Sequence, residues 1–280
     1  IIIAPPASGK TAECIDQILA VHKERPLAQV WVVVPNPKKA AYFKSRLAEA
    51  GGGMGIRVGA FRNFYQEILE EAGSFAPVIT PALSHRLIQE TVQEAYAAGE
   101  LTHYAAIKDK PGFLSVLRDA FAELRSAMVR PSAFLEYTRE ASPARRELAI
   151  LYDRFLASLE TLGWTDAEGQ AWQAIKALEN NPDLALRLSL VIADGFTSFT
   201  AAQRQFLKLL GHQAGDLLIT LTGELGSTRQ VDGRSLVVLE ELQRDLSPEI
   251  HVLKESTQLP AEFLHMQQHV LDPGKVKQQD

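Results

Sequence analysis

The sequence contains only one cysteine, Cys14, among its 280 residues. A single thiol excludes an internal disulfide and any cysteine cluster for zinc or an iron–sulfur centre, and it fits a reducing compartment. No apolar stretch approaches the ~20 residues that would span a bilayer, and the first residues do not resemble a signal peptide. We therefore expect a cytoplasmic protein with no membrane partner.

The chain also lacks an excess of positive charge, because 34 Asp and Glu residues outnumber 29 Lys and Arg residues and the formal net charge is −5. Any nucleic-acid binding must therefore come from a local basic surface. The seven histidines show no metal-ligand spacing. Hydrophobic residues make up 46% of the chain, which is enough to bury a large core.

The sequence does contain a phosphate-binding pattern close to residue 1. The β-branched run Ile1 to Ile3 stops at a turn ending in Gly-Lys-Thr, and apolar residues then recur at helical spacing. This matches the P-loop pattern, with Ala4 in place of its usual first glycine. We expect the loop to bind ATP through Ala7, Ser8, Gly9, Lys10 and Thr11.

Thr11 and Asp194 are expected to form a magnesium site beside the loop. The Thr11 hydroxyl would bind Mg²⁺, while Lys10 would reach the β- and γ-phosphates. P-loop proteins also place a carboxylate at the end of an adjacent apolar strand, and the strand expected from Leu188 ends at Asp194. Hydrolysing members usually add a neighbouring acid that orients water, but the next residue here is Gly195, so no catalytic residue is assigned.

Strand and helix patterns alternate in both terminal thirds of the chain. Further strands are expected over 28–35, 56–60, 188–194 and 216–221 and near 251–253. Helices are expected to start at Asn36-Pro37, Thr80-Pro81 and Ser142-Pro143. From about Thr80 to Asn181 only helical periodicity remains.

These patterns predict an α/β fold, with a P-loop NTPase-type parallel sheet, flanking helices and an inserted all-helical subdomain. The expected core comprises residues 1–79 and 182–255, and the insertion comprises residues 80–181. Residues 256–280 are expected to be a tail or linker toward a missing second domain. Because the chain starts inside a strand without methionine, residue 1 is expected to be a numbering origin or to follow lost residues.

The order of these motifs resembles superfamily 1 helicases. The segment from Val32 to Leu47 looks like their second conserved block, and Val58 to Leu69 looks like the next. A closer resemblance is to the N-terminal, helicase-like region of AddB/RexB-type subunits of bacterial ATP-dependent helicase–nucleases, most specifically in Asp-Gly-Phe-Thr-Ser-Phe-Thr from Asp194. The resemblance implies a helicase 1A/1B-like fold in a complex for DNA double-strand-break repair and recombination, with an AddA/RexA-like partner subunit.

The same resemblance implies contacts with single-stranded or end DNA where helices follow the second and third strands. Side chains at the carboxyl edge of a sheet can hold successive phosphates. The candidate DNA-binding residues are Asn36, Lys38, Lys39, Arg62 and Asn63. Lys38 and Lys39 equally fit a solvated helix start, and Phe64 and Tyr65 fall on an apolar stripe typical of core residues.

The departures from active helicases are also informative. Gly195 stands where they have a catalytic glutamate, and Thr222 to Ser227 stands where a glutamine would face the γ-phosphate. A second helicase domain with arginine fingers and a nuclease domain are not found in the sequence. The chain is therefore expected to be a fragment that binds ATP and DNA with weak or no hydrolysis. Two alternatives stay open, namely a structural scaffold with a decayed P-loop and an active small P-loop NTPase or kinase.

Overall fold

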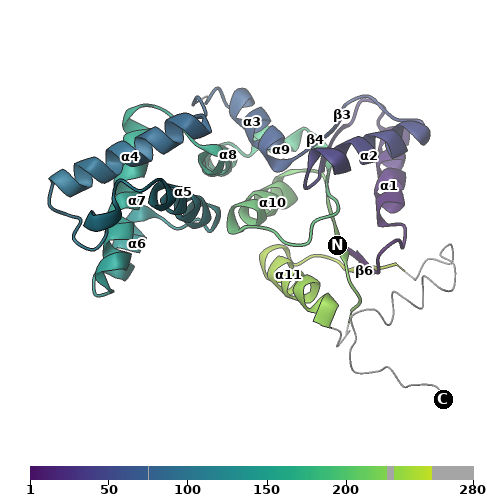
Figure 1. Cartoon of the computed structure of the whole chain (residues 1–280). Helices are drawn as coiled ribbons and strands as arrows, with labels where there is room; N and C mark the ends of the chain where they lie inside the picture. Colours follow the sequence, from purple (N-terminus) through teal and green to yellow (C-terminus); the bar gives the residue numbers. More distant parts are fainter. Residues whose placement is uncertain (75, 226–229, 254–280) are drawn as a thin grey trace, which may run out of the picture. The chain divides into compact units, whose positions relative to one another are not determined.

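The computed structural model describes residues 1–74, 76–225 and 230–253, and the expected tail at 256–280 lies outside these described residues. They form two compact units (Figure 1). The sheet unit contains Ile1–Phe64, Asn181–Phe199 and the residues from Arg204, and the helical unit contains Tyr65–Asn180 and Thr200–Gln203. The assignment of these units to helicase-type domains stays a prediction.

A six-stranded sheet forms the centre of the sheet unit. Its strands are β1 Ile2–Ala4, β2 Gln29–Val33, β3 Ile56–Gly59, β4 Leu188–Ala193, β5 Leu217–Thr222 and β6 His251–Val252. They lie in the order β3-β2-β4-β5-β1-β6, and every neighbouring pair is parallel. The expected α/β class with a parallel sheet is thus confirmed.

One detail of the expected sheet was wrong. The strand that ends before Asp194 was expected to adjoin the strand that leads into the loop, but β5 lies between β4 and β1. Periodicity identifies a buried strand without specifying its neighbours, since these depend on where each crossover helix leads the chain. The observed strand order places the carboxyl end of β5 between the loop and Asp194.

Helices cover both faces of this sheet. Successive side chains of a strand point to opposite faces, so neighbouring residues of β2 have different partners. On one face, α1 Lys10–Glu24 and α2 Pro37–Glu49 contribute to a buried cluster of Cys14, Ile15, Ile18, Val30, Val32, Val34, Phe43, Leu47, Leu190 and Ile192. On the other face, the ring of Trp31 lies 4.5 Å from that of Phe64, in α3 Phe61–Glu71. Phe206, in α10 Ala201–Gln213, lies 6.4 Å from Phe61 on the same helix α3.

The expected helix starts are largely confirmed. The Asn36 side chain accepts a hydrogen bond from the N–H of Lys39, and the Thr80 side chain accepts one from the N–H of Leu83. Ser142 precedes α7 without such a bond. Two elements were not predicted, the short helix α9 Asp183–Leu186 and the 3₁₀ helix Ala105–Ile107, because three or four residues are too few to show periodicity.

The helical unit, whose helices Figure 1 draws, packs around its own apolar core. Its principal helices are α4 Pro81–Ala97, α5 Pro111–Ser126, α6 Pro131–Thr138, α7 Pro143–Thr161 and α8 Ala167–Asn180. Phe121 stacks on Phe155 with ring centroids 5.2 Å apart, and Tyr152 donates a hydrogen bond to the Val129 carbonyl at 2.9 Å. In the described chain, no helix combines the length and apolar character needed to span a bilayer.

A buried carboxylate fixes a loop of the helical unit. Glu147 is 4% exposed and accepts hydrogen bonds from the N–H groups of Thr102, His103 and Tyr104 and from the Thr102 hydroxyl, at 2.7 to 2.9 Å. Burial alone would raise the pKa of Glu147, but these donors outweigh burial and hold the pKa below its usual value. The loop therefore depends on the ionised form of this side chain.

Candidate functional site

The loop between β1 and α1 has an unusual backbone. Ala7 and Gly9 have φ values of 57° and 84°, and Gly9 caps the helix that begins at Lys10. A Cβ atom at Gly9 would meet nothing within 4 Å, so its backbone conformation rather than a lack of space favours glycine. Left-handed residues in such a turn form the backbone concavities that bind anions.

The loop offers hydrogen-bond donors that the rest of the described chain does not use. The N–H groups of Ala7, Ser8 and Gly9 have no acceptor among the described residues. The first N–H groups of α1 also lack intrahelical acceptors, as at any helix start, and no side chain caps them. The Ser8 hydroxyl is inaccessible to solvent and has no partner in the described chain. This donor set fits a phosphate group.

Lys10 folds back over the same loop. Its Nζ donates hydrogen bonds to the carbonyl oxygens of Ala4 and Pro5 at 2.9 and 2.6 Å. Burial lowers the pKa of Lys10 to about 8, an effect that Asp194 opposes and the positive charge of Lys39 reinforces. The group therefore remains largely protonated at neutral pH and supplies a fixed positive charge beside the loop donors.

A network of hydroxyl groups surrounds Asp194. Thr11 Oγ1 donates to Asp194 Oδ2 at 2.9 Å, although the two residues are 183 positions apart in the chain. Thr220 Oγ1 donates to Asp194 Oδ1 at 2.6 Å and accepts a hydrogen bond from the N–H of Gly195 at 3.2 Å. Both oxygens of this buried carboxylate are thus held in place, one of them beside the start of α1.

Thr220 was not identified from the sequence as a site residue. It lies in β5, the strand between β4 and β1, and it is 1% exposed. A threonine within the apolar run of β5 was the available signal, because a buried hydroxyl requires a hydrogen-bond partner. Its role could be assigned only once β5 was placed beside Asp194.

The Thr11 and Asp194 oxygens fit the hard oxygen ligands that Mg²⁺ prefers. Among the described residues, no group of three or more His, Cys, Asp or Glu side chains is placed to hold a metal ion. Mg²⁺ commonly keeps several waters and takes further oxygens from substrate phosphates. The expected site would therefore use Thr11 and Asp194 together with such oxygens.

The residue after Asp194 has no side chain but does have a charged neighbour. Gly195 has a φ of 80°, in the left-handed region. A Cβ atom at this position would lie 3.8 Å from the Nζ atom of Lys39, which extends from α2. The structure therefore brings Lys39, assigned from the sequence to a DNA surface, to the edge of the candidate nucleotide site.

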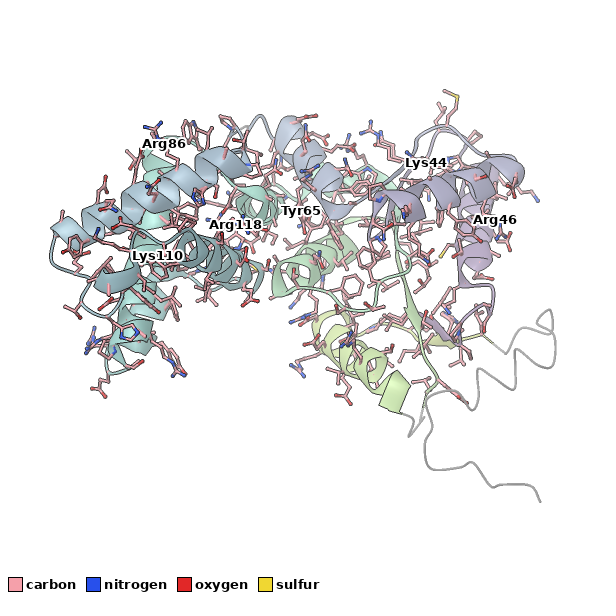
Figure 2. All side chains as sticks on the ribbon, in the orientation of Figure 1. Lys44, Arg46, Tyr65, Arg86, Lys110 and Arg118 are labelled. Atoms are coloured by element: carbon pink, nitrogen blue, oxygen red, sulfur yellow. The ribbon has the colours of Figure 1, made fainter. Side chains whose placement is uncertain are left out.

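The other candidate DNA-binding residues have different local roles. The amide oxygens of Asn36 and Asn63 accept hydrogen bonds from the N–H groups of Lys39 and Ala60, both at 3.0 Å, so they stabilise the starts of α2 and α3. Lys38 and Arg62 are exposed. Further basic side chains, Lys44 and Arg46, lie on α2 (Figure 2).

The expected burial of the two aromatic residues on α3 is confirmed. Phe64 is 2% exposed, and Tyr65, labelled in Figure 2, is 5% exposed. Neither ring is therefore accessible for stacking on a nucleobase.

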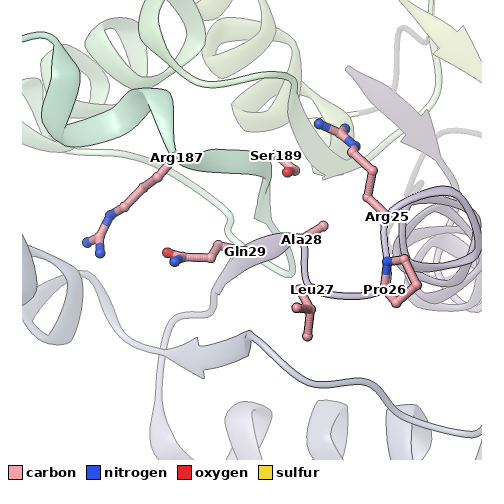
Figure 3. Close-up of a pocket in the computed structure, with 7 residues that line it drawn as sticks. All are labelled: Arg25, Pro26, Leu27, Ala28, Gln29, Arg187 and Ser189. Carbon is pink, nitrogen blue, oxygen red and sulfur yellow. The ribbon is translucent and has the colours of Figure 1, made fainter.

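A hollow of about 430 Å³ lies where β2 and β4 begin, at the opposite end of these strands from Asp194. Figure 3 shows Arg25 and Arg187 at opposite sides of this hollow, with guanidinium groups that do not converge. Ligands of parallel sheets usually bind at the carboxyl ends of the strands. The loop, Asp194 and Thr220 lie at that edge, so they form the stronger candidate site.

Comparison with known proteins relates most of the chain to one family. Residues 1–239 match the family model described as "ADDB, N-terminal". The chain is 25% identical over 235 residues to an ATP-dependent helicase/deoxyribonuclease subunit of Moorella thermoacetica, a match covering 79% of this chain and 20% of that protein. It is 24% identical over 230 residues to the protein of the same name from Carboxydothermus hydrogenoformans, covering 80% of this chain and 21% of that protein. The matched region thus spans about a fifth of the length of these curated relatives.

Proposed function

The chain belongs to the ADDB N-terminal family, whose model matches residues 1–239, and from this premise we propose that it is the nucleotide-binding, helicase-like part of a DNA-repair helicase–nuclease subunit. It would bind ATP with Mg²⁺ at the loop between β1 and α1. The names of both relatives describe one subunit of a helicase/deoxyribonuclease, so a partner subunit of the AddA/RexA type is part of the proposal.

The hydrogen bond between Thr11 and Asp194 is the observation that carries this proposal. It places a hydroxyl and a carboxylate side by side at the start of the helix whose N–H groups are available to an anion. Lys10 adds a positive charge on the same loop. Together these groups match what a magnesium–nucleotide requires, namely oxygen ligands for the metal and donors for the phosphates.

We propose that bound ATP is hydrolysed slowly or not at all. Hydrolysis needs an oriented water molecule in addition to a metal and positioned phosphates. Gly195 has no side chain with which to orient water, and the charged side chain that lies beside it, apart from the preceding Asp194, is the cation Lys39. The site is therefore suited to binding nucleotide rather than to turning it over.

Single-stranded or end DNA is proposed as the second ligand. Lys38 and Arg62 are exposed after β2 and β3, where basic side chains could hold phosphates without reading bases. An acidic chain that relies on few cations would bind DNA weakly, and its binding would weaken further as salt is added.

Equilibrium binding of a fluorescent ATP analogue with Mg²⁺ tests the proposal. Lys10→Ala should weaken binding about 100-fold, because it removes the charged donor to the phosphates. Lys23→Ala is the matched control, since Lys23 is exposed near the other end of α1. Circular dichroism establishes that each variant is folded.

The outcomes distinguish the alternatives. Unchanged affinity in a folded Lys10→Ala variant would refute a nucleotide site at this loop. A wild-type chain that binds no analogue would favour the structural scaffold. Steady-state turnover of several ATP per second, lost in Lys10→Ala, would restore the active NTPase (typical enzymes turn over about 10 per second).

A further inference from the structure

Lys39 lies on α2 but reaches the carboxyl edge of the sheet beside Asp194. The Asn36 side chain caps α2 by accepting from the N–H of Lys39, which fixes the first turn of the helix. The N–H of Asp194 donates to the carbonyl of Val33, the last residue of β2, at 3.0 Å. The start of α2 is therefore held beside the corner formed by Asp194 and Gly195.

The side chain of Lys39 follows this corner closely. A Cβ atom at Gly195 would lie 3.8 Å from Lys39 Nζ and 3.9 Å from both Cδ and Cε. The distal half of the Lys39 side chain therefore lies on the side of Gly195 that a Cβ atom would occupy. In the part of the chain that the structure describes, no carboxylate forms an ion pair with Lys39.

Lys39 and Lys10 both lie close to Asp194 or to its direct partner. Lys39 extends beside Gly195, the residue after Asp194, and Asp194 is hydrogen-bonded to Thr11, the residue after Lys10. Two like charges near one another repel, and an anion bound between them relieves this repulsion. Hydrolysing P-loop proteins usually place the acid that orients the attacking water next to the metal-binding carboxylate, and Lys39 lies beside the residue at that position, Gly195.

Building on the nucleotide-binding function proposed above, we propose that Lys39 binds the terminal phosphate of a nucleoside triphosphate, across from Lys10. The site would then distinguish a triphosphate from a diphosphate through a residue of α2. Lys39 would take the place next to Asp194 that an acid takes in hydrolysing proteins, and it would stabilise the bound triphosphate.

Lys38 provides an internal control for this assignment. It is exposed like Lys39 and adjacent to it in α2, but successive residues of a helix point about 100° apart. Removing its charge changes the net charge of the chain and of α2 by the same amount. A purely general electrostatic effect would therefore appear in both variants.

The test compares fluorescent ATP and ADP analogues binding to the 280-residue chain in the presence of Mg²⁺. Lys39→Met should weaken the ATP analogue about tenfold, the loss of one partly exposed charge-assisted contact, and should leave the ADP analogue within about twofold. Lys38→Met should leave both affinities within about twofold. The same variants are titrated with short oligo(dT).

Four results would overturn the assignment. Lys39→Met could leave the ATP analogue unaffected while Lys10→Ala abolishes binding, in which case this inference fails and the proposed function stands. Equal weakening of the ATP and ADP analogues would show that Lys39 does not bind the terminal phosphate. Loss of oligo(dT) binding alone would return Lys39 to the DNA surface. A wild-type chain that binds neither analogue would refute the proposed function and this inference together.

Discussion

Replacing Thr220 by valine tests whether the buried hydroxyl holds Asp194 in place. Valine has nearly the same shape, so the substitution removes the hydroxyl without opening a large cavity. The lost contacts are the 2.6 Å hydrogen bond to Asp194 Oδ1 and the 3.2 Å bond from the N–H of Gly195. Because Thr220 is 1% exposed, water does not readily replace the hydroxyl.

The expected cost follows from these contacts. A hydrogen bond to a charged group contributes about 2 kcal/mol, and leaving the half-buried N–H of Gly195 without an acceptor adds about 1 kcal/mol. The free energy of unfolding of the sheet unit should therefore fall by about 3 kcal/mol. Thr220→Ser keeps the hydroxyl and removes one methyl group, so it should cost only about 1 kcal/mol.

Urea unfolding followed by tryptophan fluorescence measures the effect. Trp31 is buried in the sheet unit, whereas Trp164 and Trp172 belong to the helical unit, so a background with Trp164→Phe and Trp172→Phe reports on the sheet unit. With a slope of about 2 kcal/mol per molar urea, Thr220→Val should lower the midpoint by about 1.5 M.

The control is Thr222→Val, which alters an exposed threonine on the same face of β5 and should change stability by less than about 0.5 kcal/mol. Equal effects of the two valine variants, or a larger loss in Thr220→Ser than in Thr220→Val, would refute the reasoning.

Two further predictions concern the rest of the chain. Glu147→Gln should destabilise the helical unit by about 2 kcal/mol near pH 7, because the amide cannot accept all four hydrogen bonds. The pKa of Glu147 is lowered in the folded state, so the difference in free energy of unfolding between wild type and Glu147→Gln should be constant above the unfolded pKa of about 4.3. This difference should shrink as pH falls through the pKa of the folded state. Urea unfolding from about pH 7 to pH 3 measures it, with exposed Glu140→Gln as the control. Lys38→Ala combined with Arg62→Ala should weaken single-stranded DNA binding regardless of base sequence and reduce its salt dependence. Fluorescence anisotropy measures both effects. Lys44→Ala on α2 is the control, and an equal effect of this variant would show that DNA binds elsewhere.

The sequence was most informative where local physics determines structure. Three β-branched residues before Gly-Lys-Thr predicted a strand, a tight loop and a helix, and the structure has β1 followed by α1 from Lys10. The apolar stripe of α3 predicted that Phe64 and Tyr65 would be buried, which they are. An apolar run ending in an acid indicated Asp194, and the structure places it beside Thr11.

The sequence could not reveal features that depend on how distant segments meet. Thr220 became a site residue only because β5 inserts between β4 and β1, and strand order is not encoded in periodicity. Lys39 looked like any exposed lysine at a helix start, because its direction depends on the Asn36 cap and on the register between β2 and β4. Asn63 likewise folds back to the N–H of Ala60, which required the end of β3 to be in place.

The backbone at Gly195 has a consequence for any attempt to convert the site into an efficient ATPase. A glutamate introduced there would adopt a left-handed conformation that disfavours side chains by about 1 kcal/mol or more. Its carboxylate would also meet the Lys39 ammonium as an immediate neighbour and would form an ion pair with it instead of orienting water. A gain of ATPase activity would thus require coordinated changes on two elements, the end of β4 and the first turn of α2. Gly195→Glu alone would form an ion pair with Lys39 and stay inactive.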